Sequence, residues 1–322
     1  MKKIEIFELK LVYLALIIIH ILFLFLNFTT KKCEHNDVSK LLNFSFRLFE
    51  NEIITQKMKE FAGWELSIEQ VYFINGIIRK MKPKRCLEIG VSEGGSSILI
   101  LNSIKDLKGS ILVSLDLNEY NYKKKNLKTG YRVKQFFPEL ITHNNWKLYT
   151  GNQPHIFLDK IQLKFDFLFL DTVHSMPGEV INLIEALPFL EENCTIVLHD
   201  TLYHLPKMRQ GMYFRPSNIY LYTALQGYKI IFREKLSNIG AIMLFPNQEN
   251  FYLNYFYLLL SPWQYLPKQI QCEELKKFIQ KYYKEDIYIE TFNLAYQTNK
   301  LFFERANSNN TYYFIKRNNS KN

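Results

Sequence analysis

Closely spaced cysteines are missing from this sequence. The four that it contains lie far apart, and no two are separated by only two residues: Cys33, Cys86, Cys194 and Cys272. This spacing excludes a zinc ribbon and a thioredoxin-like redox site. Cys86 and Cys194 fall in apolar runs typical of strands, where a free cysteine behaves as a small buried hydrophobe. This cysteine usage is that of a protein from a reducing compartment.

Nucleic-acid-binding motifs are also missing, although the chain is basic. Its 322 residues carry a formal net charge of +10, and the sequence pI is about 9.2. The basic residues are scattered, and neither a zinc finger nor an RNP signature occurs. The densest group, YNYKKKNLKTG at 120–130, reads as a solvated surface loop. We therefore expect no nucleic-acid partner.

Charged residues are absent from 11–28, which read LVYLALIIIHILFLFLNF. An apolar run of about 18 residues is long enough for a membrane-spanning helix, and His20 is its only strongly polar residue. No small-x-small cleavage site follows, which argues against a cleaved signal peptide. We predict a membrane anchor within residues 1–32. A helix lying at the membrane surface and a helix buried in a core are the alternatives.

The rest of the chain divides where its pattern changes. Residues 33–66 are polar with apolar interruptions and read as a linker with a short helix. Residues 67–246 alternate strand-like and helical segments, and residues 247–306 are aromatic and helical in period, which predicts a C-terminal helical extension. The Asn-rich tail at 307–322 is expected to be disordered.

The segments between 67 and 246 predict an α/β fold with a doubly wound, mostly parallel sheet. Ser67 and Gln70 fit a capping box that opens a helix, and Pro83 ends that helix. Helical patterns then alternate with apolar runs predicted as strands, at 85–89, 111–117, 146–149, 165–170, 195–198, 229–232 and 241–245. Near-continuous apolar strands between helices are typical of a parallel sheet covered on both faces. The short separation of the last two strands predicts an antiparallel pair.

The stretch CLEIGVSEGGSS at 86–97 predicts a glycine-rich turn between the first strand and the next helix. Its glycines, Gly90, Gly94 and Gly95, do not have the spacing of the dinucleotide fingerprint, and no Gly-Lys-Ser/Thr follows as in a P-loop. The turn offers a close backbone approach at Gly90 and the amino end of a helix facing a ligand. Asp116 follows the second strand, where a carboxylate can accept both hydrogen bonds of a ribose diol.

Polar side chains recur where the other predicted strands end. They are Gly151 and Asn152 after the third strand, Asp171 and His174 after the fourth, and His199 and Asp200 after the fifth. Ligands of open parallel sheets bind at the carboxyl ends of the strands. We therefore expect these residues and the first turn to form one site.

Four strand-end motifs occur in a recognisable order: Glu88-Ile89-Gly90 with Gly94-Gly95-Ser96-Ser97, Leu115-Asp116, Phe169-Leu170-Asp171-Thr172-Val173-His174 and Val197-Leu198-His199-Asp200-Thr201. Over roughly residues 67–246 the chain resembles class I S-adenosylmethionine-dependent methyltransferases. It is similar in particular to the subgroup of macrocin-type sugar O-methyltransferases and cephalosporin-hydroxylase-like proteins. The resemblance implies a seven-stranded Rossmann-like sheet of order 3-2-1-4-5-7-6 with an antiparallel last strand.

The resemblance implies that S-adenosylmethionine is the cofactor. Glu88 and Gly90 would lie beside its methionine part, Asp116 would bind its ribose, and Asn152 would lie near its adenine, where many relatives have an aspartate. The other candidates for cofactor binding belong to the first turn: Ser92, Gly94, Gly95 and Ser96.

The resemblance also implies a divalent cation. Relatives hold magnesium at the strand ends that correspond to Asp171, His199 and Asp200. Oxygen ligands suit Mg²⁺, and a histidine among them also suits Mn²⁺. His199 stands where an acid is usual, which leaves the presence and identity of the metal open. Asp171 and His174 are the candidate catalytic residues, because a histidine can take the proton of a reacting hydroxyl.

These features predict an O-methyltransferase that acts on a hydroxyl of a sugar or a glycosylated small molecule. An NAD(P)-dependent oxidoreductase is one alternative, against which the glycine spacing argues. An inactive, membrane-tethered binding module is another, which His199 would fit. Because S-adenosylmethionine is a cytosolic metabolite, we expect a membrane-associated protein whose domain faces the cytoplasm. The acceptor is beyond the sequence, and a homo-oligomer is left open.

Overall fold

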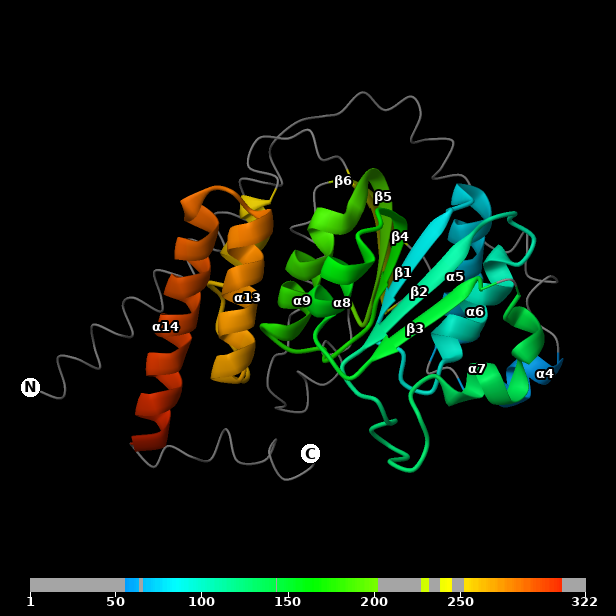
Figure 1. Cartoon of the computed structure of the whole chain (residues 1–322), viewed down its shortest axis with the longest axis horizontal. Coiled ribbons are helices and arrows are strands. Elements are labelled where there is room, and N and C mark those ends of the chain that lie inside the picture. The colour runs from blue at the N-terminus through cyan, green and yellow to red at the C-terminus, as the bar shows by residue number, and fades with distance from the viewer. Residues whose placement is uncertain are drawn as a thin grey trace, which may run out of the picture.

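A seven-stranded sheet forms the centre of the computed structural model (Figure 1). The structure describes residues 56–63, 66–142, 144–201, 227–231, 238–244 and 252–308. The strands are β1 (Arg85–Ile89), β2 (Ile111–Asp116), β3 (Trp146–Thr150), β4 (Phe165–Leu170), β5 (Leu190–His199), β6 (Gly227–Ile231) and β7 (Ile239–Leu244).

The order of the strands is β3-β2-β1-β4-β5-β7-β6. The five strands from β1 to β5 pair in parallel, and β7 runs antiparallel to both β5 and β6. The predicted fold class, strand order and antiparallel pair are thereby confirmed. Because β1 to β5 are parallel and contiguous, their carboxyl ends share one edge of the sheet.

The strands are apolar on both sides because helices cover both faces. In β4, Phe167 and Phe169 pack into the hydrophobic cluster of one face. Leu168 and Leu170 pack into the cluster of the other face. Alternate side chains of a strand point to opposite faces, so a near-continuous apolar run is required when neither face meets water.

One face is covered by helices α4, α5, α6 and α7 (Figure 1). α5 begins with the predicted capping box, in which the Ser67 amide donates to Gln70 Oε1 at 2.8 Å and the Gln70 amide to Ser67 Oγ at 3.3 Å. The patterns did not predict the short helices α7 and η2. The bounds are α4 (Gln56–Phe61), α5 (Ile68–Met81), α6 (Gly95–Ile104), α7 (Tyr131–Phe136) and η2 (Pro138–Leu140).

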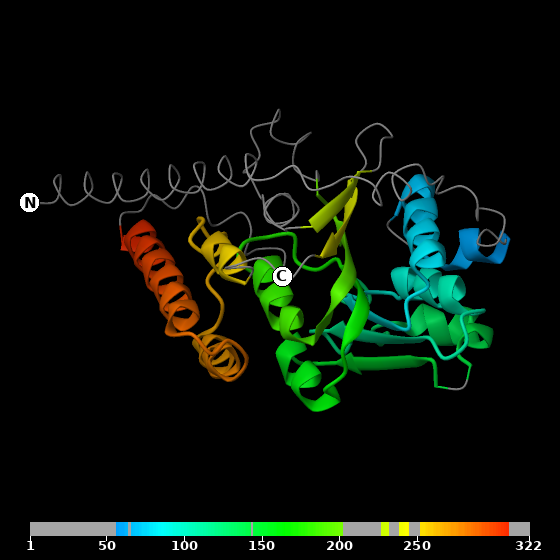
Figure 2. The ribbon, with the colours of Figure 1, turned by 90° about the horizontal axis from the view of Figure 1, so that it is seen from above.

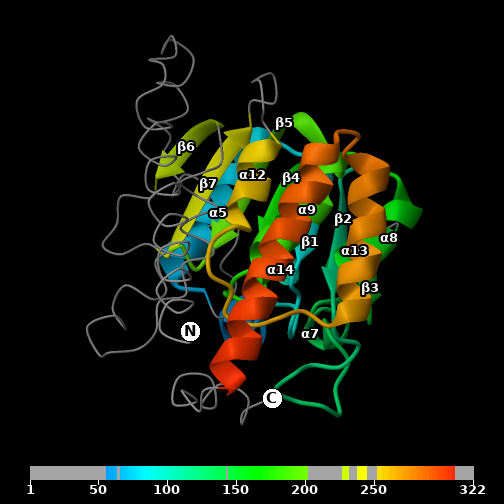
Figure 3. The ribbon, with the colours of Figure 1, turned by 90° about the vertical axis from the view of Figure 1, so that its left-hand side faces the viewer.

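Helices of the second half of the chain cover the other face in two layers (Figures 2 and 3). α8 and α9 lie on the sheet, and the C-terminal helices pack outside them. Tyr283 links the layers by donating its hydroxyl hydrogen bond to the Ile184 carbonyl at 2.5 Å. The bounds are α8 (Pro154–Ile161), α9 (Gly178–Ala186), η3 (Leu187–Phe189), α12 (Leu253–Leu258), α13 (Gln269–Tyr282) and α14 (Asp286–Ser308).

The segments at both ends of the chain lie outside the described ranges. The predicted anchor, the linker up to residue 55 and the tail after residue 308 fall there, so they stay predictions. Among the helices that the structure describes, none has the length and apolar character needed to cross a membrane. α4 is a short helix within the range predicted as a linker.

Gly90 is the position of the sheet edge that tolerates a side chain least. Its φ is +95°, and a Cβ built there would lie 1.8 Å from the backbone oxygen of Asp171. We predict that Gly90→Ala lowers the free energy of unfolding by about 3 kcal/mol or more, from backbone strain and overpacking together. Denaturant titration of the full chain measures this change.

Gly109→Ala is the matched control. Gly109 also has a positive φ, +79°, but a Cβ there would meet nothing within 4 Å. It should cost only the strain of the left-handed backbone, about 1–2 kcal/mol. Equal losses for the two variants would contradict the close approach of Gly90 to Asp171.

Candidate active site

The turn after β1 is shaped by its neighbours in the sheet. The Gly90 amide donates to the Leu115 carbonyl at 2.9 Å, and the Asp171 amide donates to the Ile89 carbonyl at 3.0 Å. Gly90 must lack a side chain because the Asp171 carbonyl passes beside it. The sequence predicted that the missing side chain of Gly90 lets a ligand approach the backbone. In the structure it is the backbone of Asp171, at the end of β4, that approaches Gly90.

The end of the turn leads directly into α6. Gly94 caps this helix with a φ of +101°, and Gly95 is its first residue. A Cβ on Gly94 would lie 2.9 Å from Val133 Cγ2 of α7. Gly94 therefore allows the turn to pack closely against the neighbouring helix.

Glu88 lies at the predicted strand end, but its carboxylate points into the protein. It has no exposed surface. One of its oxygens accepts from Ser96 Oγ at 2.5 Å, and the other accepts from Ser97 Oγ and Ser114 Oγ, both at 2.6 Å. Burial raises the pKa of Glu88 to about 7, although the three serine hydrogen bonds oppose this rise. Glu88 and Ser96 thus support the turn from beneath, whereas the resemblance implied that they contact the cofactor.

Asp116 joins the end of β2 to the first turn. Its Oδ2 accepts the amides of Val91 at 2.9 Å and Ser92 at 3.0 Å, and its Oδ1 accepts the amide of Asn118 at 2.8 Å. A carboxylate offers about four acceptor positions, so three amides leave room for a ligand hydroxyl. Asp116 is partly exposed, which is the placement expected of a residue that binds a ribose.

Asn152 lies on the same edge, one strand further out. It is exposed and follows Gly151, whose amide donates to the Asp116 carbonyl at 3.1 Å. The structure therefore brings the predicted ribose and adenine residues to neighbouring strand ends.

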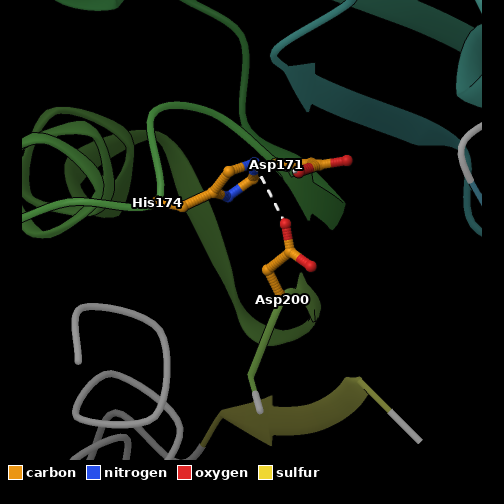
Figure 4. A group of neighbouring side chains, drawn as sticks. All are labelled: Asp171, His174 and Asp200. Carbon is orange, nitrogen blue, oxygen red and sulfur yellow. Dashed lines mark ion pairs between the residues drawn. The ribbon is translucent and has the colours of Figure 1, made fainter. Parts of the chain in front are cut away.

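Asp171, His174 and Asp200 converge at the ends of β4 and β5 (Figure 4). His174 Nε2 lies 3.0 Å from Asp200 Oδ2 and 3.7 Å from Asp171 Oδ1. One donor atom from each of the three residues lies within 4.8 Å of the others. His174 and Asp200 have left-handed backbones with φ of 50° and 56°, a strained conformation that is common at functional sites.

His199 lies beside this group. Its Nδ1 lies 3.3 Å from Asp171 Oδ2 and 3.6 Å from Asp200 Oδ2, while its Nε2 lies 3.5 Å from Gln70 Oε1. Only 7% of its side chain is exposed, against 28% for Asp171 and for His174. The sequence named His199 as the metal-ligating histidine, whereas the donor set of the structure contains His174.

The charges of this cluster depend strongly on one another. Burial alone would lower the pKa of His174, but hydrogen bonds to Asp200 and Glu179 and the charge of Asp171 raise it to about 11. The pKa of His199 rises to about 10, because Asp171 and Asp200 outweigh its burial. Burial would raise the pKa of Asp200, but the two histidines hold it well below its usual range. Near neutral pH both imidazole rings are therefore protonated on both nitrogens and positively charged.

Two residues that contact the cluster were not predicted from the sequence. Glu179 of α9 has no exposed side-chain surface, and its Oε1 lies 3.1 Å from His174 Nδ1. Asn238, just before β7, donates a hydrogen bond to Asp200 Oδ1. An acid in the first turn of an apolar helix was the available signal for Glu179. The fold alone brings Asn238 to Asp200.

The C-terminal extension steadies the loop that carries His174. The Gln264 amide donates to the Met176 carbonyl at 2.9 Å, and the Met176 amide donates to Gln264 Oε1 at 3.0 Å. This reciprocal pair fixes the chain just after His174. The extension is therefore part of the framework of the site.

Replacing Glu88 by glutamine tests the burial of its carboxyl. Because the folded-state pKa of Glu88 is about 7 and the unfolded value is near 4.3, the folded state holds the proton between these values. Wild-type stability relative to Glu88→Gln should therefore fall as pH rises from about 4.5 to about 7, and then level off. Denaturant titrations at pH 5 and pH 8 measure the difference. The same difference at both pH values would contradict a raised pKa.

Comparisons with known proteins found one matching family and several similar solved structures. Residues 87–201 match a protein family described as a methyltransferase domain. A methyltransferase of Podospora anserina, PaMTH1, bound to SAH is 16% identical with a TM-score of 0.44, over 67% of this chain and 98% of that chain. The O-methyltransferase from Bacillus cereus in complex with SAH is 15% identical with a TM-score of 0.45, over 63% and 99%.

A third solved structure is similar to the same degree. The O-methyltransferase TomG from Streptomyces achromogenes, in complex with SAM, is 15% identical with a TM-score of 0.43, over 66% of this chain and 96% of that chain. No protein with a curated description matches the chain.

The family match spans the first turn, Asp116 and the cluster of Asp171, His174 and Asp200. It covers most of β1, all of β2 to β5 and the helices between them, and it ends before β6 and β7. Residues 87–201 therefore match a methyltransferase domain, the enzyme class that the sequence predicted.

Proposed function

We propose that this protein is an S-adenosylmethionine-dependent O-methyltransferase that modifies a hydroxyl of a sugar or a glycosylated small molecule. The observation that carries the proposal is the placement of its acids. In the order β2-β1-β4-β5, Asp116 ends β2, the turn follows β1, and Asp171 and Asp200 follow β4 and β5. A donor lying across the turn would have its ribose at Asp116 and its sulfonium toward Asp171.

Asp116 supports this orientation through its hydrogen bonds. Its three amide partners fix the carboxylate, and the residue is partly exposed. S-adenosylmethionine supplies a reactive methyl group when bound. The chain itself must then align a hydroxyl with that group and accept its proton.

Two groups of the cluster are candidates for accepting the proton. Asp171 is 28% exposed at the end of β4 and can accept it directly. His174 carries a proton at neutral pH, since its pKa is about 11 in this arrangement. His174 can act as a base only when it has lost this proton. That requires a different positive charge, such as a bound cation, to balance the carboxylates of Asp171 and Asp200.

The same residues fit a divalent cation. Asp171, His174 and Asp200 offer two carboxylates and one imidazole within 4.8 Å of one another, a donor set that suits Mg²⁺ or Mn²⁺. A cation there would lower the pKa of an acceptor hydroxyl and orient it. Buried Glu179 holds the His174 ring from its far side.

The predicted anchor completes the proposal. A helix at residues 11–28 would hold the domain at the cytoplasmic face of a membrane, where the donor is available. Its length of about 18 apolar residues is the support for this placement.

Calorimetric titration with S-adenosylhomocysteine tests the donor site. The full chain should bind it, and Asp116→Ala should weaken binding by about tenfold or more, because a charge-assisted hydrogen bond to the ribose is lost. Asp106→Ala is the control: Asp106 is an exposed acid at the opposite end of α6, 65% exposed, paired with Arg79. It should bind like the wild type.

Asp116 also holds the turn, so the folded fraction of each variant is checked by circular dichroism. A wild-type chain that does not bind S-adenosylhomocysteine would overturn the proposed function. Unchanged binding by a folded Asp116→Ala variant would overturn the role of Asp116.

Titration with Mn²⁺ tests the cation site. The wild type should bind it, and Asp171→Asn and Asp200→Asn should each weaken binding by about tenfold or more, because one charged ligand is lost. Asp159→Asn serves as the control, since Asp159 lies on α8 and pairs with Lys281. Equal Mn²⁺ binding by the wild type and both site variants would contradict a metal at this cluster.

A further inference from the structure

The lysine-rich stretch after β2 is a folded hairpin. Buried Asn121 accepts the amides of Lys123 at 2.9 Å and Lys124 at 2.8 Å through its Oδ1. Tyr120 and Lys128 form an antiparallel bridge. This segment, residues 117–130, is called the β2 hairpin below. Its internal hydrogen bonds give it a defined conformation, although most of its side chains are exposed.

The β2 hairpin is attached to the first turn of the candidate active site. The Gly130 amide donates to the Ser92 carbonyl at 2.9 Å, and Asn121 Nδ2 donates to Ser92 Oγ at 3.3 Å. On its other side, Glu119 lies so close to Gly151 that a Cβ there would be 2.8 Å from Glu119 Cγ. The β2 hairpin therefore extends from the turn after β1 to the turn after β3.

Tyr122 is the residue of the β2 hairpin that reaches the site. Its side chain interacts with that of Ser92, and it lies within range of the charges of Asp171 and Asp116. Burial raises the pKa of Tyr122, the hydrogen bond to Ser92 opposes this rise, and the charges of Asp171, Glu93 and Asp116 add to it. The residue as a whole is still 56% exposed. Tyr122 thus contacts the turn at Ser92 while more than half of its surface is open to solvent.

We propose that Tyr122 contacts the methyl donor between its ribose, at Asp116, and its reacting end, at Asp171, and that this contact determines donor affinity. The inference rests on the proposed function and adds to it a residue outside the strand-end motifs. Tyr122 is attached through Asn121 and Ser92 to the turn that the donor would cross. A donor in that position would cover the exposed part of the ring.

The physical basis is burial of an aromatic ring that carries a polar group. Covering the apolar surface of the ring favours binding, and the hydroxyl can retain a hydrogen bond to Ser92 or donate one to the ligand. The burial of ring surface and the hydroxyl hydrogen bond both require a side chain that touches the bound donor. The backbone of the neighbouring aromatic residue, Tyr120, forms an antiparallel bridge with that of Lys128 within the β2 hairpin.

Titrating full-length variants with S-adenosylhomocysteine tests the inference. Tyr122→Ala should weaken binding by about tenfold or more, because the ring surface is lost. Tyr122→Phe should weaken it by about fivefold or less, because only the hydroxyl is lost. Tyr120→Ala, the matched control from the same hairpin at 49% exposure, should bind within about twofold of the wild type.

The outcomes separate this inference from the function on which it rests. If the wild type binds and Tyr122→Ala binds equally well, the role of Tyr122 is wrong and the proposed function stands. If Tyr120→Ala loses as much affinity as Tyr122→Ala, the effect belongs to the hairpin as a whole, and the specific role of Tyr122 is again wrong. If the wild type does not bind, the proposed function and the inference fall together.

Discussion

The hydrogen bonds from the amides of Val91 and Ser92 to the Asp116 carboxylate are the interaction on which the rest of the site depends. They fix the turn after β1 to the end of β2. Gly90, in that turn, lies directly beside the Asp171 carbonyl, so the position of β4 is linked to the same carboxylate. The β2 hairpin rests on Ser92. One acid therefore organises the donor side of the candidate active site.

The cluster around His174 contains more acidic than basic side chains. Asp171, Glu179 and Asp200 surround His174, and His199 lies next to Asp171 and Asp200. In the arrangement described, the two protonated rings compensate for part of this negative charge. A cation could take over the same role, which would free His174 to accept a proton. The cluster therefore links metal binding to the availability of a base.

The sheet could be predicted because strands buried on both faces must be apolar and polar residues begin where they end. The orientation of side chains could not. Glu88 turns inward because Ser96, Ser97 and Ser114 surround it, and only the folded chain brings these three hydroxyls together. For the same reason a histidine at the end of β5 looked like the metal ligand, whereas the loop after β4 places His174 in the donor set.

The lysines of the β2 hairpin indicated a solvated loop, and their side chains are indeed exposed. The pattern contained no signal that Asn121 would fold this loop back onto Ser92 and bring Tyr122 to the site. Sequence periodicity reports burial, and a loop that is exposed on one side can still contact a ligand on the other.

A crystal structure of the full chain with S-adenosylhomocysteine would test the central claim most directly. The account predicts the ribose hydroxyls at the Asp116 carboxylate, the nucleoside across the turn that contains Gly90, and the sulfur facing Asp171 and His174. A nucleoside bound at another edge of the sheet, or with its sulfur directed away from Asp171, would contradict it.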